Sequence, residues 1–258
     1  MSKSENKPDS LKLRTLFTSH GRYWREFRYV YPVISRRAHG LSIGVNLNPD
    51  GACNFDCVYC QVDRSSPLPR GKVDLDILRA ELQQLVAHYP ALFEQPEFAS
   101  VPPEYRRLND IAFSGDGEPT AALVFPEAVN LAAEVRRVNG AEQAKIVVIT
   151  DACFLTRPKV AEALRVLDAN NGEIWAKLDA GTEAYFQRVN RPSHSLEHVL
   201  ANITAAARER PLVIQTLFMR LEDAPPPTEE IAAYLGRLRA IAEQGGQIKL
   251  VQIYTVAR

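Results

Sequence analysis

The hydrophobic and polar positions of the chain follow two alternating periods, which together predict a repeated order of strands and helices. Short apolar runs bounded by turn residues are typical of buried strands; they cover residues 41–47, 111–114, 145–150, 174–179, 212–218 and 248–254. Amphipathic windows with the helical period lie between these runs, at residues 74–89, 124–139, 158–169, 183–189, 195–209 and 228–244. Strands that alternate with helices indicate a parallel sheet with helices on its outside.

This order favours a curved sheet. Because strand–helix–strand crossovers are right-handed, a repeated crossover winds the sheet in one direction. The predicted fold class is α/β, a partial (βα)6 parallel barrel with an N-terminal extension. A flat, doubly wound sheet is the alternative. We expect an N-terminal arm at residues 1–40 and a core domain at residues 41–258.

Composition narrows the class of protein. With 258 residues, 46% of them hydrophobic, the chain can form one α/β domain with a full core. Basic and acidic residues number 31 each, so no net field attracts nucleic acid or an anionic membrane. No apolar run approaches the roughly 18 residues of a bilayer span, and the polar N-terminus is unlike a signal peptide. We therefore expect a cytoplasmic protein without membrane contact.

Three cysteines indicate a metal site. Cys53, Cys57 and Cys60 follow a CxxxCxxC spacing in a short loop after the first predicted strand. Thiolates select zinc, copper(I) or iron–sulfur clusters. Structural zinc normally has four protein ligands, but Cys153 lies far away and the histidines show no zinc-finger spacing. An iron–sulfur cube held by three cysteines leaves one iron open to a non-protein ligand.

A glycine turn and several polar side chains follow the later strands. The turn runs from Ser114 to Glu118, and its glycines permit close approach to the backbone; a plain strand-to-helix connection is the alternative. Lys177 and Asp179 are two residues apart and share one face of a strand. When buried there, they form either a mutual ion pair or a ligand site. Gln215, inside an apolar strand, either binds ligand or satisfies backbone groups at a barrel seam.

The cysteine spacing resembles that of the radical S-adenosylmethionine (radical SAM) superfamily, and the glycine turn some fifty residues later is similar to its "GGE" element. Further stretches within residues 29–192 resemble a wyosine-related branch of iron–sulfur oxidoreductases. The resemblance implies a [4Fe-4S] cluster held by Cys53, Cys57 and Cys60. It also implies reductive cleavage of S-adenosylmethionine to a 5′-deoxyadenosyl radical, which abstracts hydrogen from a substrate.

The same resemblance assigns roles to the candidate residues. Tyr59, which precedes the third cysteine, would pack beside adenine, and the backbone of the glycine turn would receive the methionine amino group. Lys177 would meet the carboxylate of S-adenosylmethionine or line the substrate cavity, and Asp179 would orient it. The whole cofactor-binding set implied in this way is Tyr59, Ser114, Gly115, Asp116, Gly117, Glu118, Thr150, Lys177, Asp179 and Gln215.

The substrate and partners stay open. The wyosine-related branch implies a tRNA base, whereas the neutral net charge and the lack of a second cysteine trio disfavour it. The alternatives are an enzyme that installs a glycyl radical in a partner protein and a non-catalytic iron–sulfur electron-transfer protein. An electron donor such as flavodoxin or ferredoxin is the expected partner. Arg188, Arg191 and the basic, aromatic stretch at residues 20–31 are candidates for anionic or base-stacking contacts, with solvated or capping roles as alternatives.

Overall fold

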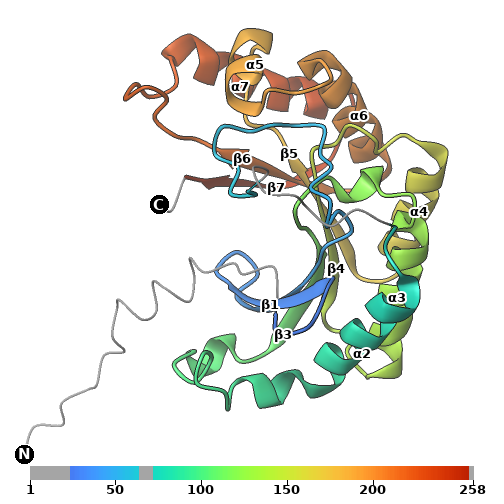
Figure 1. The fold of residues 1–258 in the computed structure, drawn as a ribbon. Coiled ribbons are helices and arrows are strands. Elements are labelled where there is room, and N and C mark those ends of the chain that lie inside the picture. The colour runs from blue at the N-terminus through green and yellow to red at the C-terminus, as the bar shows by residue number, and fades with distance from the viewer. Residues whose placement is uncertain (1–23, 64–71, 256–258) are drawn as a thin grey trace, which may run out of the picture.

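A computed structural model describes residues 24–63 and 72–255, which form a curved seven-stranded sheet with helices along its convex side (Figure 1). The strands are β1 (Val30–Ser35), β2 (Gly40–Val45), β3 (Leu108–Phe113), β4 (Lys145–Thr150), β5 (Gly172–Lys177), β6 (Leu212–Leu217) and β7 (Ile248–Tyr254). The helices are α2 (Leu75–Leu92), α3 (Phe125–Val138), α4 (Pro158–Asp168), α5 (Glu183–Asn190), α6 (Leu196–Glu209) and α7 (Thr228–Glu243). Short 3-10 turns at Pro103–Tyr105 and Pro119–Ala121 flank β3.

The strands lie side by side in chain order, from β1 to β7. Strands β2 to β7 are parallel, as predicted. A doubly wound sheet would instead reverse its strand order in the middle, so that alternative is wrong. Because β1 and β7 are the two ends of the strand order and do not pair with each other, the barrel is open.

The N-terminal region contributes a strand that the apolar pattern did not predict. Strand β1 pairs antiparallel with β2 through a tight turn, and Tyr29 and Tyr31 are buried. Residue 40, the expected end of the arm, therefore lies within a hairpin of the sheet. Of the basic, aromatic stretch at residues 20–31, residues 20–23 lie outside the described part of the chain.

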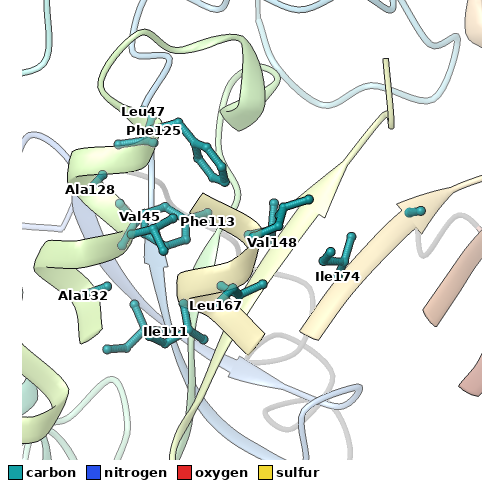
Figure 2. Packing of buried hydrophobic residues seen from close by; sticks show 14 of the residues in the cluster. Val45, Leu47, Ile111, Phe113, Phe125, Ala128, Ala132, Val148, Leu167 and Ile174 are labelled. Atoms are coloured by element: carbon teal, nitrogen blue, oxygen red, sulfur yellow. The ribbon is translucent and has the colours of Figure 1, made fainter. Parts of the chain in front are cut away.

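The main core lies between the convex face of the sheet and the helices. Figure 2 shows Val45, Ile111 and Phe113 of the sheet pointing toward Ala128 and Ala132 of α3. Small alanine side chains let the helix pack closely on the large residues of β2 and β3. All five residues are at most 5% exposed, and burial of such apolar area is the main stabilising contribution to folding.

Polar residues occupy the concave face near the starts of the strands. Glu173 accepts hydrogen bonds from Lys145 of β4, at 2.7 Å, and from Trp175 Nε1, at 3.1 Å, and it forms an ion pair with Lys249 of β7. Strands β3 and β5 begin earlier than predicted because Asp110 and Glu173 face this side and find polar partners there.

No helix among the described residues has the length and apolar content needed to cross a bilayer.

Candidate active site

The cysteine loop follows β2, and the glycine turn after β3 holds it from one side. The backbone N–H of Glu118 donates to the carbonyl of Ala52, at 3.0 Å. A Cβ atom at Gly117 would lie 1.9 Å from that carbonyl oxygen, and one at Gly115 would lie 2.3 Å from Asn46 Oδ1. These glycines are therefore required by the close approach of the protein's own loop, whereas the sequence analysis had explained them by a ligand.

Helix α5 holds the cysteine loop from the other side. The backbone N–H of Asp56 donates to the carbonyl of Asn190, at 3.0 Å, and that of Val58 donates to the carbonyl of Val189, at 2.9 Å. In Figure 1 the loop after β2 extends to the region of α5 at the same end of the sheet. The loop is thus fixed between two elements that follow it by about 60 and 130 residues in the chain.

The three loop cysteines differ in exposure. Cys53 and Cys60 are exposed, while Cys57 is partly buried. Although Cys53 as a residue is exposed, desolvation of its thiol by the surrounding chain raises the pKa of Cys53 to about 12, and burial also raises the pKa of Cys57. Among residues 24–63 and 72–255, no group of three or more His, Cys, Asp and Glu side chains is arranged to hold a single metal ion. Cys153 is buried outside the loop, and its backbone N–H donates to Asp151 at 2.9 Å.

Beneath the loop, Asp179 is the centre of a buried hydrogen-bond network. Its carboxylate accepts from Tyr59 OH, from Asn190 Nδ2 at 2.7 Å, and from the backbone N–H of Leu217 at 2.8 Å. Lys177 Nζ lies 3.3 Å from Asp179 Oδ2. The two residues thus form the ion pair that the sequence analysis gave as one alternative, and each oxygen of the carboxylate is satisfied.

The Lys177 ammonium group is enclosed by aromatic rings as well. It donates to Tyr254 OH at 2.8 Å and lies 5.0 Å from the centroid of the Tyr59 ring. Burial opposes its charge, but Asp179 and Tyr254 outweigh this effect and raise the pKa of Lys177. The pKa of Tyr59 is also raised, mainly by burial and to a lesser extent by the negative charge of Asp179. The phenol therefore stays neutral and can donate to the carboxylate.

Glu118 forms a second buried centre at the ends of β3 and β4. It accepts from Thr150 Oγ1 and from the backbone N–H of Asp151, both at 2.7 Å, and from the backbone N–H of Thr120 at 2.9 Å. Burial, together with the nearby Asp151 carboxylate, raises the pKa of Glu118 to about 8. Asp151 in turn accepts from Asn54 Nδ2 of the cysteine loop, at 3.0 Å. Glu118 and Thr150, both predicted to bind the cofactor, thus satisfy each other.

The remaining predicted residues also have protein partners. Asp116 accepts from Asn46 Nδ2 at 2.6 Å, and the Ser114 carbonyl accepts from Tyr31 OH at 3.0 Å. Gln215 donates to the side chain of Gln252 on β7, at 3.0 Å, and so lies at the seam between β6 and β7.

Two of the residues singled out in sequence form surface pairs. Arg188 lies 3.4 Å from Glu222, and Arg191 lies 3.6 Å from Asp56, with all four side chains at least half exposed. No site role was predicted for Asn190 or Tyr254 from the sequence.

The donor set fits a thiolate-bound cluster. Three cysteines lie in one loop at the carboxyl ends of the strands, where parallel barrels place ligand sites. Asn190 Nδ2 lies 3.4 Å from Cys57 Sγ, a contact typical of the hydrogen bonds that support metal-bound sulfur. Asn190 Oδ1 is buried without a hydrogen-bond partner among the described residues. Such an orphan acceptor is rare in a finished core.

Comparison with curated proteins finds relatives of unassigned activity. The chain is 31% identical over 172 residues to UPF0026 protein MJ1312 of Methanocaldococcus jannaschii, which covers 64% of this chain and 44% of that protein. It is 29% identical over 201 residues to UPF0026 protein slr1464 of Synechocystis sp., covering 75% and 66% respectively. The chain thus spans about half to two thirds of the length of these relatives.

Solved structures share the fold. "Native anSMEcpe with bound AdoMet" superposes with a TM-score of 0.57 at 14% identity, over 83% of this chain and 51% of that one. A radical SAM methyltransferase from Sphaerobacter thermophilus superposes with a TM-score of 0.50 at 14% identity, over 88% of this chain and 69% of that one.

The family model of the radical SAM superfamily matches residues 47–225, which include the cysteine loop, the glycine turn and the Lys177–Asp179 pair. The chain therefore belongs to the radical SAM superfamily.

Proposed function

We propose that the chain holds a [4Fe-4S] cluster through Cys53, Cys57 and Cys60 and uses it to cleave S-adenosylmethionine. The observation that carries this proposal is the position of the cysteine loop, which is pinned between the glycine turn and α5 above the buried Lys177–Asp179 pair. When bound, the cluster supplies one electron to S-adenosylmethionine, which yields methionine and a 5′-deoxyadenosyl radical for hydrogen abstraction.

The chain's own residues would bind and orient the cofactor. Lys177 provides a fixed positive charge beside the loop, suited to a carboxylate, and Tyr59 provides a partly buried ring for a base to pack against. Asp179 holds both side chains in place through its ion pair and its hydrogen bond. Because these groups are held by the fold before any ligand binds, little ordering cost falls on cofactor binding.

An outside reductant has a route to the loop. Cys53 and Cys60 are exposed, so a cluster on this loop lies near the surface. We propose a low-potential donor such as flavodoxin or ferredoxin as the partner. The tRNA-base substrate implied by the wyosine-related resemblance stays a prediction. A strong dependence of tRNA affinity on salt would support it.

Anaerobic reconstitution with iron and sulfide, followed by dithionite and S-adenosylmethionine, tests the proposal. We expect 5′-deoxyadenosine from the wild type and none from Cys57→Ala. The matched control is Cys153→Ala, because Cys153 is a buried thiol outside the loop and should be dispensable for product formation. A wild type that binds the cluster but forms no product with several reductants would contradict the proposal and favour an electron-transfer protein.

A further inference from the structure

Asn190, the last residue of α5, contacts the cysteine loop with both its backbone and its side chain. Its carbonyl accepts from the N–H of Asp56, and its Nδ2 lies 3.4 Å from Cys57 Sγ. The residue has no exposed surface, so neither contact competes with bulk water. A single residue thus fixes the loop backbone and one of its thiols.

The orientation of the Asn190 amide is determined by its neighbours. Nδ2 lies 2.7 Å from Asp179 Oδ2 and 3.3 Å from Tyr59 OH. A reversed amide would place Oδ1 against the Asp179 carboxylate and would leave Cys57 without a donor. The observed orientation keeps the N–H groups toward Cys57 and Asp179, at the expense of a buried Oδ1 with no partner in the described part of the chain. An unpaired buried acceptor costs about 1–3 kcal/mol.

An N–H donor to a cluster sulfur has a known physical effect. Reduction adds negative charge to an iron–sulfur cluster, and a hydrogen bond to sulfur stabilises that charge. A donor in this position also fixes the orientation of the cysteine that binds the metal, and its loss usually weakens metal binding. Asp179 prevents the Asn190 amide from rotating away, so the donor is already in place before the cluster binds.

We propose that Asn190 is a positioning residue of the cluster, which orients the Cys57 thiolate and raises the reduction potential through its Nδ2–H group. This inference rests on the proposed function, because it presupposes a cluster on the three cysteines.

The test compares wild type with Asn190→Leu, which has a similar branched shape and no donor, and with Asn190→Ser, whose shorter side chain withdraws the donor from Cys57. The matched control is Asn202→Leu. Asn202 is a buried asparagine of α6 that donates to Ala152 and Cys153 carbonyls and contacts none of the loop cysteines. Iron and sulfide content and an EPR-monitored redox titration are measured without S-adenosylmethionine, so the readout is independent of turnover.

We expect both Asn190 variants to shift the midpoint potential to more negative values, while Asn202→Leu keeps the wild-type value. A tenfold change in the reduction equilibrium corresponds to about 59 mV for a one-electron couple. Variants that melt like the control as apoproteins but fail to take up iron would support the orienting role. A wild-type potential in either fully loaded Asn190 variant would overturn the proposal. A wild type that takes up no cluster would overturn the proposed function itself.

Discussion

Removing the charge of Asp179 should destabilise the protein strongly even without any cofactor. The carboxylate is 1% exposed, is paired with Lys177 at 3.3 Å, and accepts three further hydrogen bonds. Asp179→Asn keeps the shape but leaves the Lys177 ammonium without its counter-charge, and such a loss costs about 3–5 kcal/mol. Since domains are stable by about 5–15 kcal/mol, the variant should lose about a fifth or more of its stability.

The double variant separates the ion pair from the rest of the network. Lys177→Met alone should cost less than Asp179→Asn, because Tyr59, Asn190 and Leu217 still satisfy the carboxylate. Adding Lys177→Met to Asp179→Asn removes the orphan charge, so the double variant should be more stable than the sum of the single changes predicts. Coupling energies for contacting residues are about 0.5–3 kcal/mol.

Urea unfolding of the apoproteins at pH 7 measures these free energies. Arg79 and Glu134 provide the control, because their ion pair is shorter, at 2.9 Å, but both side chains are 47% exposed. Glu134→Gln should change the free energy of unfolding by less than about 1 kcal/mol. If Asp179→Asn cost no more than Glu134→Gln, or if the two single changes were additive, the reasoning that burial makes this pair strong would be refuted.

Three further substitutions test the cysteine loop, helix α7 and the polar residues near the starts of the strands. Gly117→Ala would bring its Cβ to 1.9 Å from the Ala52 carbonyl oxygen, so it should reduce iron uptake and lower the free energy of unfolding by about 1–3 kcal/mol. Gly236→Ala has open space around the new Cβ and should instead stabilise α7 by up to about 1 kcal/mol. Melting temperatures of the two variants equal to that of the wild type would contradict both predictions. Burial raises the pKa of Asp110 to about 6, so the protonated Asp110 carboxyl group favours folding below about pH 4, and this contribution is lost as the group ionises and pH rises through 6. Asp110→Asn, which retains an acceptor for Ser42, should be more stable than wild type at pH 7 by up to about 3 kcal/mol. The gain should vanish below pH 4, and thermal unfolding at the two pH values measures it; a gain that did not depend on pH would contradict the assignment to ionisation.

The sequence predicted those strands that carry their own signal. Strands β2 to β6 are buried on the helix side, whereas β7 is partly exposed; all six read as apolar runs between turn residues. Strand β1 carries Pro32 and follows a basic, aromatic stretch, so its pattern is that of an irregular arm. It becomes a strand through pairing with β2, and such tertiary pairing leaves no local period in the sequence.

The site residues could be predicted from the sequence only where they lie close together in the chain. The cysteines were visible because all three lie within eight consecutive residues. The partners of Asp179 include Tyr59, Asn190 and Leu217, at separations of 120, 11 and 38 residues. No spacing rule links residues so far apart. Asn190 in particular stood beside two arginines whose charge attracted the prediction, while its own role depends on where α5 ends.

The distance along the chain between Cys57 and Asn190 also sets an order of events during synthesis. The two residues are 133 positions apart. At translation rates of about 5–20 residues per second, the cysteine loop leaves the ribosome roughly 7 to 27 s before the helix that secures it. During that interval the thiols are part of an unfinished sheet and are open to oxidation or to stray metals. Correct assembly therefore requires that the nascent loop stay reduced until α5 has emerged.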